Sequence, residues 1–144
     1  MDNYEIQEYC KDIPGFKGVF PCNDPMFSSH ALPNECGIVN FETYEAGGTH
    51  WVCYSVKNNM NYYFDSFGGM PDTLLENYLR RTGDLIYNTS QFQAFDSQAC
   101  GYFCIYVLQQ LVKRDFDDIM LDFDFEHDNE NLLRKFFGTQ VVTA

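Results

Sequence analysis

The stretch Cys100–Lys113 constrains the fold more than any other part of the sequence, because most of its side chains are apolar or aromatic. Ile105, Leu108 and Val112 recur within it at helical spacing. A helix that is hydrophobic nearly all round is enclosed by other elements. We therefore predict a largely buried helix over this stretch.

Three strand-like runs precede that helix in the chain. They are rich in β-branched and aromatic residues and cover Cys36–Phe41, Thr49–Val56 and Asn61–Phe67. Residues 57–60, Lys-Asn-Asn-Met, favour a hairpin turn between the last two runs. A shorter strand is predicted over Leu85–Tyr87.

Further helices are predicted on both sides of these strands. Tyr4–Cys10 has helical spacing, with Asn3 as its cap. Pro71 opens a second helix at its first position and Gly83 ends it. A last helix over Asn129–Phe137 is expected to bury four apolar side chains, namely Leu132, Leu133, Phe136 and Phe137.

The segment 14–34 is punctuated by proline and glycine, so we expect it to consist mainly of loops. No internal repeat is visible. The order of the predicted elements indicates an α+β fold, with a mixed central β-sheet flanked by helices. The length of 144 residues fits a single domain spanning 1–144.

The composition argues against several classes of protein. Hydrophobic residues make up 45% of the chain, more than a disordered chain carries, yet no apolar run approaches the ~18 residues of a membrane span. The net charge of −12 opposes unassisted binding to nucleic acid or to an anionic membrane. The N-terminus has no visible signal peptide, so we expect an intracellular protein. Nothing indicates a coiled coil, and we expect a monomer.

The six cysteines form no C-x-x-C pair, and the histidines near them lack zinc-ligand spacing. We therefore predict no structural metal. In a reducing compartment the thiols are expected to be buried or functional rather than paired.

Acidic side chains are concentrated in Asp115–Glu130, which contains no Lys or Arg. We expect this segment to be a solvated face, as an edge strand or a loop whose phenylalanines point inward. A docking patch for a basic partner is the alternative. Its carboxylates are Asp115, Asp117, Asp118, Asp122, Asp124, Glu126, Asp128 and Glu130.

Four residues in chain order, His50, Asp65, Gln93 and Cys100, form a candidate catalytic set. Each alone has an ordinary structural explanation, and Cys104, one helical turn after Cys100, is expected to be an inert core thiol. If the strands of His50 and Asp65 pair as antiparallel neighbours, the carboxylate can accept the imidazole N–H and orient the ring. The other ring nitrogen then faces a nucleophile.

Cys100 would supply that nucleophile from the N-terminus of the buried helix, where the helix dipole and an adjacent imidazolium favour the thiolate. Gly101 would allow close approach of the substrate. The backbone N–H of Cys100 and the side-chain amide of Gln93 could together hold a developing oxyanion. Nucleophile, base, orienting acid and oxyanion hole are then all present.

The residues around this set resemble those of adenain-type cysteine proteases, the adenovirus maturation protease and its relatives in virophages and Maverick/Polinton elements. SUMO-deconjugating proteases share the His–Asp–Cys order more distantly. The resemblance runs from about Cys36 to Leu108, half of the chain. The matching motifs are Cys36-Gly37-Ile38-Val39-Asn40, Gly47-Gly48-Thr49-His50-Trp51, Tyr63-Phe64-Asp65-Ser66-Phe67-Gly68, and Gln93 seven residues before Cys100-Gly101-Tyr102-Phe103-Cys104.

The resemblance implies an adenain-like fold and a role for each residue. His50 would be the general base and later acid, Asp65 its orienting carboxylate and Cys100 the nucleophile. Gln93 would be an oxyanion donor, with Gln91 a weaker candidate. Trp51 would either roof the substrate cleft or belong to the core, and as a roof it would favour slim, Gly-containing cleavage sites.

The implied function is that of an endopeptidase that cleaves viral or transposon capsid precursors through a thioester acyl-enzyme. It would act in host cytoplasm or a virus factory and be packaged in the virion if the source is viral. The adenovirus enzyme uses a disulfide-linked peptide and DNA as activators. This chain lacks a cysteine at the corresponding spacing and is acidic, so we expect no cofactor and no direct nucleic-acid partner.

Two other hypotheses use the same parts differently. A ubiquitin-like-protein deconjugase or an acyltransferase would employ the same triad. A binding module on an inactive protease fold would not need it, and the complete catalytic set argues against that option.

Overall fold

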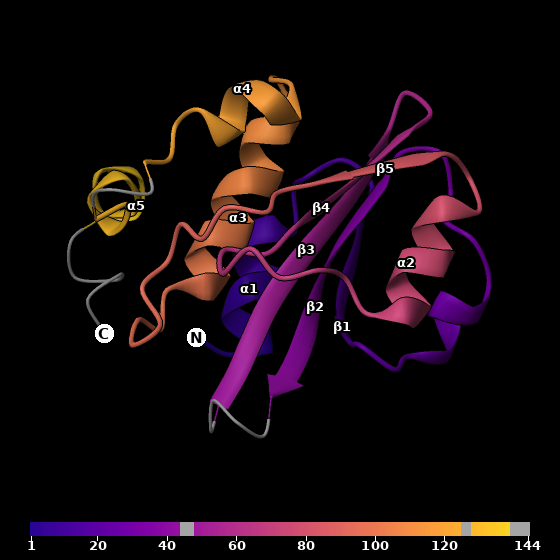
Figure 1. The fold of residues 1–144 in the computed structure, drawn as a ribbon, viewed down its shortest axis with the longest axis horizontal. Helices are drawn as coiled ribbons and strands as arrows, with labels where there is room; N and C mark the ends of the chain where they lie inside the picture. The colour runs from indigo at the N-terminus through magenta and orange to yellow at the C-terminus, as the bar shows by residue number, and fades with distance from the viewer. Residues whose placement is uncertain (44–47, 125–127, 139–144) are drawn as a thin grey trace.

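A five-stranded mixed sheet forms the middle layer of the computed structural model, which describes residues 1–43, 48–124 and 128–138 (Figure 1). The strands lie in chain order, β1-β2-β3-β4-β5. The outer pairs β1–β2 and β4–β5 are parallel, whereas β2–β3 and β3–β4 are antiparallel. Their bounds are β1 Phe16–Pro21, β2 Glu35–Thr43, β3 Gly48–Lys57, β4 Met60–Phe64 and β5 Asp84–Tyr87.

Helices cover both faces of the sheet, as predicted. One face carries α3, which packs on β3 and is surrounded by α1, α4 and α5, while α2 and a 3-10 helix lie on the other face (Figure 1). The bounds are α1 Asn3–Cys10, α2 Thr73–Arg80, α3 Cys100–Leu111, α4 Phe116–Met120, α5 Glu130–Phe137 and the 3-10 helix Pro25–Ser28.

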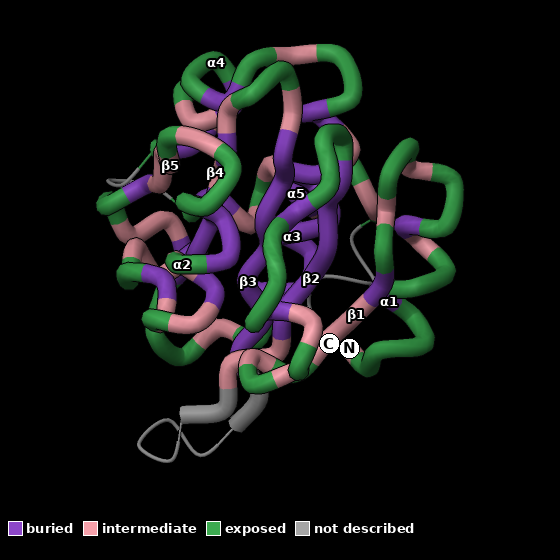
Figure 2. The backbone as a smooth tube through the Cα atoms, turned by 90° about the vertical axis from the view of Figure 1, so that its right-hand side faces the viewer, coloured by how far each residue is buried: buried purple, intermediate pink, exposed green. Residues whose placement is uncertain are grey.

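Successive side chains of β3 point to opposite faces of the sheet, so this strand contributes to the core on both faces. Trp51 and Cys53 belong to the apolar cluster around α3, whereas Val52, Tyr54 and Val56 belong to the cluster beneath α2. Figure 2 shows the resulting buried band along β2, β3 and α3. Eleven of the twelve residues of α3 are buried, which confirms the prediction of an enclosed helix.

The predicted hairpin joins β3 to β4. Asn58 and Asn59 adopt positive φ of 53° and 63°, which is the backbone that a tight two-residue hairpin turn requires and that asparagine tolerates. β4 ends at Phe64, earlier than predicted, so that Asp65 lies immediately after the strand.

The segment 14–34 contains more regular structure than predicted. β1 pairs with β2 through a register shift between Phe16 and Val19, and Gly18 lies there at φ +138°. A bulged edge strand tolerates glycine and proline, which is why Gly18 and Pro21 did not prevent β1 from forming.

Two predicted helix starts were wrong by one or two residues. Asp2, not Asn3, caps α1 by accepting the Glu5 N–H at 2.9 Å. In α2 the cap is Asp72, which accepts the Leu75 N–H, and Pro71 precedes it. An aspartate one residue before the helix competes successfully for the exposed amides.

The C-terminal third differs most from the prediction. The acidic segment contains α4, and Asp122 is not simply solvated, because it accepts hydrogen bonds from Tyr106 and from both terminal nitrogens of Arg114. Residues 125–127 lie outside the described part. In α5 only Leu133 is fully buried, whereas Phe136 is 45% exposed and Leu132 and Phe137 are half-buried.

Candidate active site

His50 and Asp65 are brought together by the antiparallel pairing of β3 and β4. His50 lies near the start of β3, and Asp65 follows the end of β4. His50 Nε2 and Asp65 Oδ1 are 2.7 Å apart, and both residues are buried. A buried carboxylate at this distance fixes the ring orientation and directs Nδ1 away from the carboxylate.

The backbone of Asp65 is held by Asn88, a residue that the sequence analysis missed. The Asp65 N–H donates to Asn88 Oδ1 at 3.1 Å, and Asn88 Nδ2 donates back to the Asp65 carbonyl at 2.6 Å. The Phe67 N–H also donates to Asp65 Oδ1 at 2.8 Å. These bonds hold the carboxylate against the imidazole. A lone asparagine after a short strand gave no signal of this role in the sequence.

The pKa of His50 reflects its two neighbours. Burial by itself lowers this pKa, but the hydrogen bond and charge of Asp65, together with the nearby Cys100 sulfur, outweigh burial and raise the pKa to about 9. His50 Nδ1 is buried and lacks a hydrogen bond of good geometry to the described residues. At neutral pH the ring is therefore an imidazolium whose Nδ1 proton is available for transfer.

Cys100 is the first residue of α3, as predicted, and is 6% exposed. The Trp51 N–H donates to Cys100 Sγ at 3.4 Å, and Cys104 Sγ donates to the Trp51 carbonyl at 3.3 Å. The backbone of one residue of β3 thus contacts both sulfurs, Cys100 through its N–H and Cys104 through its carbonyl. The Trp51 N–H and the N-terminus of α3 therefore both lie at the Cys100 sulfur.

Gln93 is buried behind the site, and its side chain is engaged at both ends. Its Nε2 donates to the Ser97 carbonyl and hydroxyl at 3.0 and 3.2 Å, while its Oε1 accepts from Ser66 Oγ at 2.5 Å. In this conformation the amide donates to Ser97. Gln91 donates to the Gln93 carbonyl instead.

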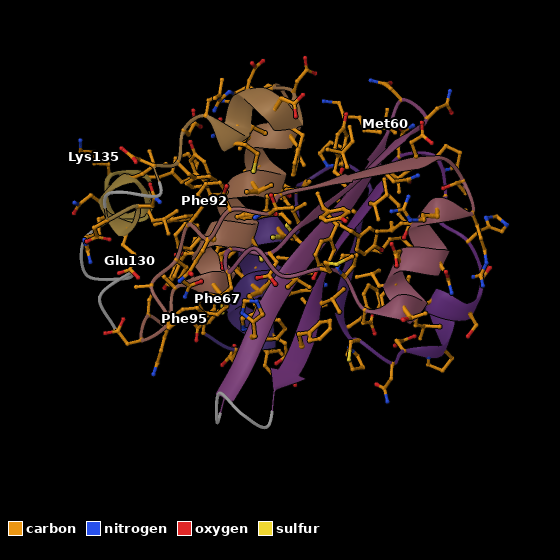
Figure 3. All side chains as sticks on the ribbon, viewed as in Figure 1. Met60, Phe67, Phe92, Phe95, Glu130 and Lys135 are labelled. Carbon is orange, nitrogen blue, oxygen red and sulfur yellow. The ribbon has the colours of Figure 1, made fainter. Side chains whose placement is uncertain are left out.

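The loop that carries Gln93 is anchored from the C-terminal helix. Asn129 Nδ2 donates to the Phe92 carbonyl at 3.0 Å, and the Ser97 hydroxyl donates to the Glu130 carboxylate. Figure 3 labels Phe92 and Glu130 on these two segments. No sequence pattern indicates this link, because Asn129 and Glu130 lie 29 and 30 positions after Cys100.

Gly101, the residue after Cys100, packs closely against Met1 and Trp51. A Cβ at Gly101 would lie 2.7 Å from Met1 Sδ and 3.4 Å from Trp51 Cδ1, so a larger residue would force Met1 to shift. Trp51 also lines a cleft of about 420 Å³ together with residues of the N-terminus, β1 and β2. Trp51 is therefore both a core residue and a wall of a cleft. Gly47, which opens the histidine motif, lies outside the described residues.

Within the described residues no group of His, Cys, Asp or Glu side chains is arranged to hold a metal ion. The six cysteines, all of them described, form no disulfide. The arrangement around His50 supplies a proton donor and acceptor beside a sulfur at a helix N-terminus. Such a set can carry out nucleophilic acyl transfer without a metal.

The sequence profile of the adenovirus endoprotease family matches residues 16–125, more than half of the chain. The chain belongs to the adenovirus endoprotease family. A thiol protease of Acanthamoeba polyphaga mimivirus is 35% identical over 97 residues, which cover 58% of this chain and 32% of that protein. A protease of bovine adenovirus C serotype 10 is 32% identical over 108 residues, covering 63% and 55%.

The similarity to a solved viral protease supports the predicted α+β fold. A crystal structure of a selenomethionine ASFV protease matches 83% of this chain and 61% of that chain with a TM-score of 0.57, at 15% identity. The chain spans between a third and a little over half of the curated relatives it matches. No described helix of this family member is long and apolar enough to cross a membrane.

Proposed function

We propose that the chain is a cysteine endopeptidase that cleaves viral or transposon capsid precursors at Gly-containing sites. The observation that carries the proposal is the buried His50–Asp65 hydrogen bond beside a cysteine that begins α3. Membership of a family whose relatives are named protease or thiol protease supports the same reaction type. If the source is viral, the enzyme acts in the infected cell and enters the virion.

In the proposed reaction the Cys100 thiolate attacks the carbonyl carbon of the scissile peptide, forming a C–S bond and moving the carbonyl electrons onto oxygen. The intermediate then collapses and breaks the C–N bond. His50, whose raised pKa keeps it protonated at neutral pH, gives its proton to the departing amine. Water attacks the thioester, His50 accepts a proton from it, and the C–S bond breaks.

Asp65 stabilises the imidazolium through both steps. The backbone N–H of Cys100, at the helix start, is the first proposed oxyanion donor. Gln93 is proposed as the second. Because its amide donates to Ser97 in the structure, this role requires the amide to share or exchange that contact when substrate binds.

The test compares wild type with Cys100→Ala on a capsid-type precursor. Cleavage is expected to disappear in the variant and to persist in the matched control Cys22→Ala, which removes a half-buried thiol outside the site. Retained cleavage by Cys100→Ala would remove the cysteine from the mechanism. An iodoacetamide rate at Cys100 no faster than that of a free model thiol would favour an inactive binding module.

The same triad would serve a ubiquitin-like-protein deconjugase or an acyltransferase. Ubiquitin-like C-terminal vinyl-sulfone probes distinguish the deconjugase, since they label Cys100 only if the globular partner docks. No labelling, together with cleavage of the precursor, supports the endopeptidase.

A further inference from the structure

Three stacked rings extend from the candidate site to the surface. The His50 and Phe67 ring centroids are 4.6 Å apart with an interplanar angle of 33°, and the Phe67 and Phe95 centroids are 5.7 Å apart at 25°. Phe95 is 80% exposed, although its neighbour in the stack is half-buried. Figure 3 labels Phe67 and Phe95 side by side.

The inner phenylalanine is fixed by its backbone. The Phe67 N–H donates to Asp65 Oδ1, and the Ser66 carbonyl accepts from the N–H groups of Phe92 and Gln93 at 2.8 and 3.0 Å. Gly68 then turns at φ +77°, where a Cβ would meet the Thr89 carbonyl at 2.7 Å. Phe67 is thus a rigid support, and Phe95 presents an apolar ring to solvent on top of it.

The position of this pair relative to His50 determines what it can contact. In the proposed reaction His50 protonates the departing amine, so the residues that follow the scissile bond pass beside the imidazole. The two centroid distances place the Phe95 ring within the length of about three extended residues of the His50 ring, because an extended residue spans about 3.4 Å. Binding sites are lined mainly by hydrophobic and aromatic side chains, and the Phe67–Phe95 pair supplies such a surface beside His50.

We propose that Phe67 and Phe95 form a substrate subsite for a large apolar or aromatic side chain, located within the first three residues after the scissile bond. The inference rests on the proposed function and adds a specificity determinant to it. The bound side chain covers the exposed face of Phe95 and stacks on it. Phe67 contacts both the Phe95 ring and the His50 ring. The same side chain therefore supports the substrate contact and the position of the imidazole.

The first experiment measures kcat and KM for peptides with a fixed Gly-containing acyl half and with Ala, Phe or Asp at each of the three following positions. Wild type is expected to prefer Phe over Ala at one position by roughly 3- to 10-fold, mainly in KM, the size of an aromatic stacking contact. Phe95→Ala should remove that preference by raising KM for the Phe peptide toward the value for the Ala peptide. Leu121→Ala, a matched control with 82% exposure immediately after α4, should retain it.

Equal KM values for Phe and Ala peptides in wild type would overturn the subsite, as would a preference that survives Phe95→Ala. A second experiment does not depend on turnover. In a Cys100→Ala background, calorimetric titration with the preferred Phe peptide should give a Kd that rises roughly 3- to 10-fold on adding Phe95→Ala and stays constant on adding Leu121→Ala.

These two experiments separate the two proposals. If wild type cleaves none of the peptides or precursors, the endopeptidase proposal fails, and the calorimetric arm alone decides the subsite. If wild type cleaves but Phe95→Ala changes neither KM nor Kd, the subsite fails and the endopeptidase stands.

Discussion

Two buried carboxylates, Asp65 and Glu35, are held in different ways. Asp65 bonds an imidazole whose second nitrogen lies toward Cys100. Glu35, at the start of β2 and 2% exposed, accepts from the hydroxyls of Tyr54 and Tyr78 at 2.5 and 2.6 Å and from the Leu32 N–H at 2.7 Å.

The difference lies in what the partners can do with a proton. Burial raises the pKa of both tyrosines far above the neutral range, and Glu35 raises it further, so the phenols remain donors. Glu35 therefore ties β2, β3 and α2 together and moves no proton. The imidazole beside Asp65 has a raised pKa and a second nitrogen toward the thiol, so in the proposed reaction it can give and accept a proton. The two carboxylates thus differ in whether their partner can transfer a proton.

Asp65→Asn sharpens this comparison with the largest expected effect. The neutral amide no longer stabilises the imidazolium, so we expect kcat to fall by roughly 10³- to 10⁴-fold. Glu35→Gln is the matched control, and its kcat should remain within about threefold of wild type where the protein is folded. A similar loss in both variants would mean that the Asp65 variant fails through structure.

Glu35→Ala should lower the stability of the fold, whereas Asp65→Asn should lower kcat. It leaves two buried phenols and a backbone N–H without an acceptor, so the free energy of unfolding should fall by about 2–5 kcal/mol, measured by urea denaturation. Glu35→Gln keeps an acceptor oxygen and should lose less. If Glu35→Ala unfolds at the wild-type midpoint, the tyrosine pair does not hold β2 to α2.

The pH dependence of stability offers a third test. Because Asp65 and Cys100 raise the pKa of His50 from 6.5 to about 9, the folded protein binds this proton more tightly than the unfolded chain. Its stabilising contribution is therefore complete below pH 6.5 and is lost as the pH rises through about 9. Denaturation midpoints should fall over that window in wild type, and by less in His50→Gln. Equal slopes in the two proteins would contradict the raised pKa.

Cleavage should also decline as the pH rises through about 9, when His50 loses the proton that the leaving group needs.

The smallest expected effect concerns the anchor between α5 and the Gln93 loop. Glu130→Ala removes the acceptor of the Ser97 hydroxyl, and the freed loop should lower kcat by about 3- to 10-fold with little change in KM. Lys135→Ala, an exposed change on the same helix, should have no effect. Equal activity in all three proteins would show that the anchor does not position Gln93.

The elements with a strong period were predictable from the sequence. β2, β3, β4 and α3 combine apolar alternation or helical spacing with clear turn residues, and the structure confirms them. β1 and α4 were missed for opposite reasons. In β1 the proline and glycine hid a bulged edge strand, whereas in α4 the carboxylates masked a five-residue helix held by Phe116 and Ile119.

The candidate site was predictable only for residues whose side chains carry a reactive or titratable group. His50, Asp65 and Cys100 carry groups whose order and spacing indicate their association, and the structure brings them together. The loop between β5 and α3 has no periodicity, so the contacts of Asn88, Ser97 and Glu130 depend on tertiary packing that no local pattern encodes.

The backbone of Trp51, with one sulfur on its N–H and another on its carbonyl, sets the spacing between β3 and α3. This spacing depends on β3 and the first turn of α3, and not on the length of the chain that joins them. Insertions at the exposed turn between α2 and β5, away from the contacts of Asp65 and Asn88, therefore leave the sulfur-to-imidazole spacing intact, whereas one residue added between His50 and Trp51 would change it. Growth of the connecting segments is the evolutionary freedom that this geometry permits.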